Sequence, residues 1–225
     1  MIEYEMSYSC QIEHLRSIYM NIFGLRNHGS FVDVGSHDGY QWSNVWGLAK
    51  AGWKGLLIEP VPELAEKCKN LYKDFENISV LRSAIGSHTG TTSLYFGSNP
   101  TINLETVEKN PWGDKYDTNN FIIVNVDTLD SVLEKYTIPI KFDLLCIDVE
   151  GAELEVLEGF SICKWIPRLV IVETHDGNPD IRRSFHAEKI NKYFKETHSY
   201  ELIFKDGLNS IFENTLGALD GIYDK

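Results

Sequence analysis

The sequence lacks the features that mark secreted, disulfide-rich or nucleic-acid-binding proteins. Its four cysteines, at positions 10, 68, 146 and 163, include no C-x-x-C pair, which argues against a zinc site or a disulfide framework. The longest basic run is Arg182-Arg183 and the formal net charge is −12. We therefore expect neither a nucleic-acid backbone nor an anionic membrane surface as the main partner.

Long apolar runs are also missing, so the sequence predicts no membrane span. Residues 1–5 have neither the basic nor the apolar part of a signal peptide. Together with the unpaired cysteines, this predicts a cytoplasmic protein. The length of 225 residues and the hydrophobic fraction of 43% suit one globular domain covering residues 1–225.

What is present is an alternation of apolar strand patterns and helical patterns. It predicts an α/β fold with a doubly wound, mostly parallel sheet and a C-terminal antiparallel hairpin. Apolar residues at helical spacing between positions 10 and 25 predict a helix, within residues 1–29, that covers the sheet. Strands are expected at residues 31–34, 55–59, 78–82, 91–95, 121–126, 142–149 and 168–173, helices at 42–51, 62–72, 128–136, 152–158 and 181–197, and the hairpin at 200–205 and 210–213.

One long segment, residues 97–120, has little periodicity and is rich in asparagine, glycine and proline. Loops of this length are usually functional or disordered. We interpret it as a substrate-facing lid, with a mobile surface insertion as the alternative. Trp112 within it could stack on a sugar ring.

A glycine-rich turn follows the first expected strand. Gly35 ends residues 31–34 and Gly39 comes four residues later. The spacing G-x-x-x-G is not the G-x-G-x-x-G of dinucleotide-binding proteins, and no Gly-Lys-Ser/Thr follows. Such a turn lets backbone N–H groups approach a ligand closely.

The second strand ends in an acid, Glu59, that can accept hydrogen bonds from the two hydroxyls of a ribose. Asp33 and Asp38 lie beside the turn and would repel phosphates, but they would tolerate a cation. A nucleoside that carries a sulfonium and an amino acid is S-adenosylmethionine. We therefore expect this cofactor in place of a dinucleotide.

Five stretches, in this order and spacing, resemble the FkbM family of S-adenosylmethionine-dependent methyltransferases: FVDVGSHDGYQWSN, GLLIEPVPEL, SAIGSHTGT, VDTLDSVL and FDLLCIDVEGAELEVLEG. The resemblance covers roughly residues 30–175. It implies O-methylation of a sugar or polyketide-type hydroxyl, and a sugar of a glycan is favoured. It also implies these cofactor-binding residues: Asp33, Gly35, Ser36, Asp38, Gly39, Asn44, Glu59 and Ala84.

The carboxyl ends of parallel strands meet at one edge of such a sheet. This brings together Gly35, Glu59, Ala84, Asp148 and Glu173. Asp148, Glu173 and His175 are the candidates for removing the acceptor proton. Asp148, Glu173 and Asp176 could instead hold a divalent cation, which the sequence does not require. Glu150 is better suited to binding backbone N–H groups at the start of the next helix.

One departure from the family pattern is Cys146, where the family usually has a lysine. It gives some support to a second hypothesis, a non-catalytic scaffold or binding module that kept the cofactor fold. Methylation of nitrogen or carbon in another small molecule and a dinucleotide-dependent dehydrogenase are further alternatives. The sequence predicts a small-molecule or glycan acceptor, and it says nothing of oligomeric state.

Overall fold

The computed structural model describes residues 4–97, 100–103, 107–108, 117–174, 181–197 and 199–215. Within these ranges, no helix combines the length and the apolar character needed to cross a membrane. The helices are α1 (Leu15–Phe23), α2 (Trp46–Lys50), α3 (Pro62–Leu71), α5 (Leu129–Lys135), α6 (Glu153–Glu158), α7 (Ile162–Trp165) and α8 (Ile181–Glu196). The strands are β1 (Ser30–Val34), β2 (Lys54–Ile58), β3 (Ile78–Leu81), β4 (Ala84–Ile85), β5 (Gly90–Tyr95), β6 (Phe121–Asp127), β7 (Leu144–Ile147), β8 (Leu169–Glu173), β9 (Tyr200–Lys205) and β10 (Asn209–Asn214).

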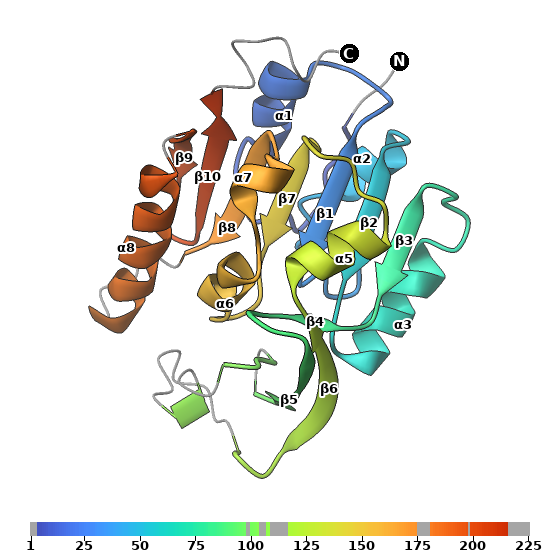
Figure 1. Cartoon of the computed structure of the whole chain (residues 1–225). Coiled ribbons are helices and arrows are strands. Elements are labelled where there is room, and N and C mark those ends of the chain that lie inside the picture. Colours follow the sequence, from blue (N-terminus) through green and yellow to red (C-terminus); the bar gives the residue numbers. More distant parts are fainter. Residues whose placement is uncertain are drawn as a thin grey trace.

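The main sheet has seven strands in the order β3-β2-β1-β7-β8-β10-β9 (Figure 1). β10 runs antiparallel to both of its neighbours, β8 and β9, and is the one strand of this sheet opposed in direction to the others. Asp206 closes the β9–β10 turn, because its Oδ1 accepts the N–H groups of Leu208 and Asn209. The predicted doubly wound, mostly parallel sheet and its C-terminal hairpin are therefore confirmed.

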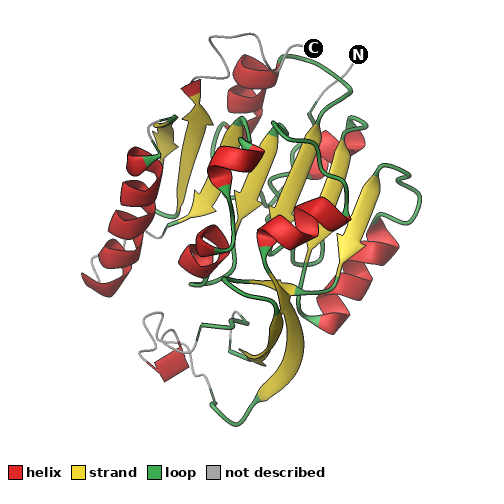
Figure 2. Ribbon diagram, viewed as in Figure 1, coloured by secondary structure: helices red, strands yellow, loops and turns green. Residues whose placement is uncertain are grey.

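Each face of this sheet is covered by helices, as the red ribbons of Figure 2 show. On one face, Val32, Leu145 and Val170 pack with residues of α5, α6, α7 and α8. On the other, Phe31, Leu144 and further strand residues pack with α1, α2 and Cys68 of α3. Both faces of the central strands are buried, which explains why their sequences are almost continuously apolar.

A second, smaller sheet in the order β4-β6-β5 lies beyond the carboxyl ends of the parallel strands (Figure 1). The sequence predicts the strand at residues 121–126 but not its separation from the main sheet. Val124 and Val126 of β6 pack on Leu94 and Ala84 in a separate apolar cluster. Because β6 pairs with β4 and β5, this sheet forms a wall opposite the edge where ligands bind in open α/β sheets.

Two expected helices begin several residues later in the structure, and one short helix, α7, is not predicted. The helix expected at residues 42–51 begins only at Trp46. Ser43 Oγ accepts the N–H groups of Val45 and Trp46, a local contact that competes with a helical backbone. The N-terminal helix begins at Leu15 and ends before Gly24, as the sequence predicts for its end.

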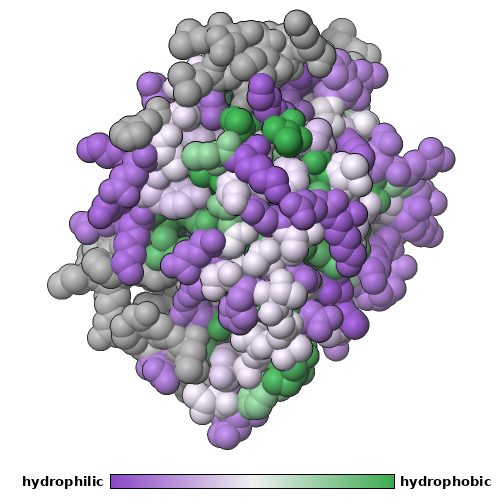
Figure 3. Space-filling view, in the orientation of Figure 1, coloured by the Kyte–Doolittle hydropathy of each residue, from purple (hydrophilic) through white to green (hydrophobic). Residues whose placement is uncertain are grey.

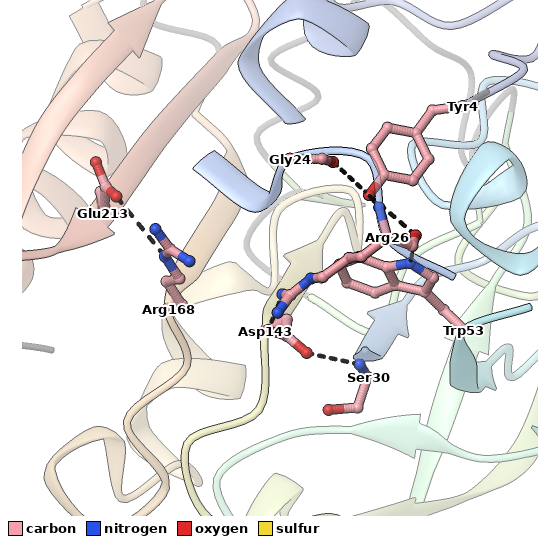
Figure 4. A network of polar contacts seen from close by, with 8 residues as sticks. All are labelled: Tyr4, Gly24, Arg26, Ser30, Trp53, Asp143, Arg168 and Glu213. Carbon is pink, nitrogen blue, oxygen red and sulfur yellow. Dashed lines mark hydrogen bonds and ion pairs between the residues drawn. The ribbon is translucent and has the colours of Figure 1, made fainter. Parts of the chain in front are cut away.

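The amino ends of β1 and β7 are tied to the N-terminal segment by a buried polar network (Figure 4). Asp143 pairs with Arg26 and accepts the N–H of Ser30 at 2.7 Å. The Arg26 guanidinium also lies 4.9 Å from the Trp53 ring centroid. The Tyr4 hydroxyl donates to the Gly24 carbonyl at 2.8 Å. This network sits at the end of the sheet opposite to the small sheet.

Replacement of Asp143 by alanine should lower the free energy of unfolding by about 3–5 kcal/mol, because it leaves the Arg26 charge buried without its partner. Urea unfolding followed by circular dichroism measures this. The matched control is Glu5→Ala, which breaks the exposed ion pair with Lys50 and should cost under about 1 kcal/mol. Equal losses in the two variants would show that the buried pair contributes no more than a surface one.

The surface seen in Figure 3 is mostly hydrophilic, with hydrophobic residues in separate small patches. This agrees with the acidic composition and the net charge of −12.

Candidate active site

A cavity of about 440 Å³ lies between the carboxyl edge of the main sheet and the small sheet. Its volume falls in the range of small-molecule sites, about 300–1,000 Å³. All five residues that the sequence places at this edge line the cavity: Gly35, Glu59, Ala84, Asp148 and Glu173.

The glycine-rich turn forms the floor of the cavity. The N–H groups of Gly35 and Ser36 both donate to the Ile58 carbonyl, at 2.9 and 3.1 Å. Gly35 has φ +88°, and a Cβ at this position would lie 1.6 Å from the Asp148 carbonyl oxygen. The end of β1 and the residue after β7 therefore touch through backbone alone, which only glycine permits.

Of the eight expected cofactor residues, Asp33, Ser36 and Asn44 also line the cavity, with Gly35, Glu59 and Ala84. Asp38 and Gly39 instead shape the turn. Asp38 Oδ1 accepts the N–H groups of Tyr40 and Gln41. Burial acts to raise the Asp38 pKa, but these hydrogen bonds and the nearby His37 outweigh it and lower that pKa. Gly39 has φ +84° and packs directly against the Tyr72 ring.

Glu59 joins the turn to the end of β2. Its Oε2 accepts the His37 N–H at 2.9 Å, and its Oε1 accepts the Val61 N–H at 2.8 Å. A carboxylate has about four acceptor sites, so each oxygen can accept one more hydrogen bond. Burial raises the pKa of Glu59 to about 7, although the two N–H groups act to lower it.

Four of the acids project from the same face of the sheet. In β1, Val32 and Val34 face one core and Phe31 the other, so Asp33 shares the face of Phe31. The N–H groups of Glu59 and Asp148 extend the strand ladders, donating to the carbonyls of Leu81 and Val34. By the same alternation, Glu59, Asp148 and Glu173 point to the Phe31 side. Burial alone raises the pKa of Asp33 to about 7.

Cys146 lies on this same face, opposite Asp33 in the register of β1 and β7, and is buried in the apolar cluster with Phe31. Burial raises the pKa of its thiol well above the usual value, and Asp33 adds to the effect. The position that carries a lysine in the resembling family therefore carries a neutral group here.

Asp148 and Glu173 lie close together at the ends of β7 and β8. Burial raises the pKa of Asp148 well above its usual value, and the neighbouring Glu173 raises it further. Glu150 joins them, because one carboxylate oxygen from each of the three lies within 4.8 Å of the others. The other two catalytic and metal candidates, His175 and Asp176, lie outside the described residues.

The structure corrects the expected role of Glu150. The carboxylate that binds backbone N–H groups before α6 belongs to Glu153, whose Oε1 accepts from Val149 and Gly151. Glu150 instead lines the cavity, with its backbone at φ +56°. The sequence places both acids near the helix start, and only the backbone conformation decides which of them faces the ligand.

The N-terminal segment contributes to the cavity and supports Asn44. The Tyr19 hydroxyl donates to the Asn44 carbonyl at 2.9 Å, and Gln11 lines the cavity with Gln41. Trp42, which the sequence places at the start of a helix, also lines the cavity and is 43% exposed. None of the three was predicted as a site residue, although Gln41 and Trp42 lie in the stretch FVDVGSHDGYQWSN that carries the family resemblance.

Part of the expected lid is described. Pro100, Thr101 and Ile102 line the cavity. Asn103 anchors this stretch, because its Nδ2 donates to the Gly151 carbonyl at 2.9 Å and to Glu155 Oε1 at 2.8 Å. Trp112 and residues 98–99, 104–106 and 109–116 lie outside the described part, so the lid stays a prediction.

Comparisons with known proteins identify methyltransferases of similar fold. Among solved structures, the fold is similar to that of a proposed caffeoyl-CoA O-methyltransferase from Staphylococcus aureus, with a TM-score of 0.51, 13% identity, and coverage of 91% of this chain and 84% of that one. It is also similar to the METTL16 methyltransferase domain, with a TM-score of 0.50, 13% identity, and coverage of 88% and 66%. At these identities the likeness shows the fold alone.

A search of curated proteins finds no significant match. The sequence profile of the methyltransferase FkbM domain, however, matches residues 33–202. That match spans the glycine-rich turn, every described acid of the cavity and most of the main sheet. The chain therefore belongs to the FkbM methyltransferase family.

Proposed function

We propose that this protein is an O-methyltransferase that uses S-adenosylmethionine and acts on a hydroxyl of a sugar, a glycan or a similar small molecule. One observation carries the proposal. The cavity at the glycine-rich turn has no Lys or Arg among its described lining residues. It is lined by five acids: Asp33, Glu59, Asp148, Glu150 and Glu173. Such a site favours a cationic ligand and disfavours a pyrophosphate.

The described residues suit the cofactor that the family implies. The free acceptor sites of Glu59 can take the two ribose hydroxyls. Gly35 lets the turn pack against the Asp148 backbone, which brings the ends of β1 and β7 together at the cavity. Ser36 is buried in the cavity wall beside the Cys68 thiol, and its Oγ makes no strong hydrogen bond with the described residues. Buried hydroxyls are normally hydrogen-bonded, so Ser36 is available to a ligand.

When bound, S-adenosylmethionine supplies an electrophilic methyl group. The protein must then hold the acceptor oxygen in line with that methyl group and take the hydroxyl proton. Asp148 and Glu173 lie at the adjacent strand ends where such an acceptor would enter. His175 follows Glu173 by two residues and stays a predicted base.

A polyhydroxyl acceptor is supported by the uncharged residues of the cavity wall. The side chains of Gln11 and Gln41 offer both donors and acceptors, and Trp42 offers an exposed aromatic face. These groups carry no charge, which suits a neutral sugar.

Calorimetric titration with S-adenosylmethionine, S-adenosylhomocysteine and NAD tests the proposal. Binding of the first two alone at micromolar concentration is expected. Transfer of a radiolabelled methyl group to a panel of sugars then identifies the acceptor. Cofactor binding without transfer to any hydroxyl compound would favour methylation of nitrogen or carbon, whereas no binding would favour a non-catalytic scaffold.

Cofactor affinity should depend on pH through Glu59. Its carboxyl has a pKa of about 7 and must be ionised to accept both ribose hydroxyls, so affinity is full above this pKa and declines as the pH falls below it. Between pH 8 and pH 6 the ionised fraction falls about tenfold, and Kd should rise by a similar factor.

The Glu59→Gln variant should bind about 1–3 kcal/mol more weakly at pH 8 and show a shallower pH dependence. Titration calorimetry at both pH values measures the two effects. Glu63→Gln, an exposed change in the first turn of α3, is the control and should match the native protein. If the Glu59→Gln variant binds the cofactor with the affinity and pH dependence of the native protein, Glu59 does not contact the cofactor.

A further inference from the structure

We propose that Asp148, Glu150, Glu173 and Asn209 form a binding site for a divalent cation that holds the acceptor. Metal binding by these four residues does not depend on the proposed function, whereas the part that the cation plays in catalysis rests on it. Asp148, Glu150 and Glu173 each offer an oxygen, and these oxygens lie within 4.8 Å of one another. This separation is about twice a Ca²⁺–oxygen distance and slightly more than twice a Mg²⁺–oxygen distance.

Asn209 is the second, independent observation. It lies in β10 directly opposite Glu173 of β8 in the antiparallel register. The Thr174 N–H donates to the Leu208 carbonyl, so Glu173 and Asn209 form a non-hydrogen-bonded pair. In such pairs the Cα atoms are about 4.5 Å apart and the two side chains lie on the same face, close to each other.

Within the described part of the chain, the amide of Asn209 is buried without the hydrogen bond that would offset its loss of water. The residue is 3% exposed, and its Nδ2 has no hydrogen-bond partner among the described residues. Buried amide groups are rarely left in this state. A cation beside Glu173 accounts for it, since rotating the amide by half a turn presents Oδ1 to the metal.

The chemistry of these ligands indicates the type of ion. Carboxylate and amide oxygens suit Mg²⁺, Mn²⁺ and Ca²⁺. The acids also gather on one face without a lysine or arginine in the described cavity wall, so a dication would offset their mutual repulsion.

A bound cation would narrow the class of acceptor. Four protein oxygens leave two positions of an octahedral site for other ligands. An acceptor with two adjacent oxygens, such as the vicinal diol of a sugar, would occupy both. The cation would lower the pKa of a bound hydroxyl, so that its proton leaves to solvent or to a base before the oxygen bonds to carbon.

Titration of the full chain with Mn²⁺ alone, without cofactor, tests the site. Loss of the free Mn²⁺ signal in electron paramagnetic resonance measures binding. We expect saturable binding of one ion. Asn209→Leu should weaken it about tenfold or more. Asn209→Asp supplies a charged oxygen of the same size and should bind at least as tightly as the native protein.

The matched control is Asn214→Asp, which introduces a carboxylate at an equally buried position at the other end of β10. It should leave Mn²⁺ affinity unchanged. Glu150→Gln, at a half-buried position in a loop, should weaken binding and tests the site without altering the sheet.

Two results would overturn the proposal. One is the absence of Mn²⁺ binding by the native protein at millimolar metal. The other is an Asn209→Asp variant as weak as Asn209→Leu, which would mean that the amide donates to Glu173. Calorimetry with S-adenosylmethionine in EDTA is run in parallel. If the protein binds the cofactor but no metal, the cation site is wrong and the proposed function stands. If it binds metal but no cofactor, the proposed function is wrong and the cation site stands.

Discussion

The Gly35→Ala variant is expected to lose measurable binding of S-adenosylmethionine, with Kd raised about 100-fold or more. The added Cβ would lie 1.6 Å from the Asp148 carbonyl oxygen and 2.7 Å from its carbon. Both contacts are with backbone atoms, so no side chain can rotate to relieve them. Either β1 or the segment after β7 must move, and both carry residues of the cavity.

Titration calorimetry of the folded variant measures this effect, and thermal unfolding measures the accompanying loss of stability. Gly24→Ala is the matched control. Gly24 has a similar positive φ of +68°, but a Cβ there would meet nothing within 4 Å. With ψ at −166°, Gly24 lies in a backbone region that essentially only glycine adopts, so the variant should lose about 1–3 kcal/mol of stability while cofactor affinity does not change. Similar affinity losses in both variants would mean that global destabilisation, and not the contact at Asp148, controls binding.

The second large effect is expected for Asp148→Asn, which should lower turnover about 100-fold or more while leaving cofactor affinity within a few-fold of the native value. The amide keeps the size of the side chain but can neither take a proton nor bind a cation as strongly. The variant retains the Asp148 N–H bond to the Val34 carbonyl, so the strand ladder is preserved.

Initial rates of methyl transfer to the acceptor found in the sugar panel measure turnover, and calorimetry measures cofactor binding. Glu153→Gln is the neighbouring control. Its amide oxygen can still accept the N–H groups of Val149 and Gly151, so its turnover should stay near the native value. Native turnover in Asp148→Asn would make Asp148 a structural residue.

The mostly parallel arrangement of the main sheet and its ligand-binding edge were predictable from local sequence patterns. Buried parallel strands require continuous apolar runs, and these runs are visible around Val32, Leu57, Leu145 and Ile171. Residues that end such runs converge at one edge because of topology, and Glu59, Asp148 and Glu173 do line one cavity. Helix ends at Gly24 and Gly159 were equally readable.

Local patterns failed where side chains compete with the backbone. Helical spacing favours a helix from Trp42, but the Ser43 hydroxyl satisfies the N–H groups of Val45 and Trp46 in a turn. Trp42 is thereby left at φ +58° and lines the cavity instead of packing in a helix. The role expected of Glu150 likewise falls to Glu153, because the backbone at Glu150 and Gly151 turns Glu150 toward the cavity and Glu153 toward the N–H groups.

The sequence by itself determined the α/β class, the glycine-rich turn and the acids at the strand ends, because each depends on residues close together in the chain. Tertiary structure alone decided that β6 leaves the main sheet to form the facing wall of the cavity. It alone also set Asn209 beside Glu173. These residues are 36 positions apart, and only the antiparallel register of β8 and β10 brings their side chains to the same point.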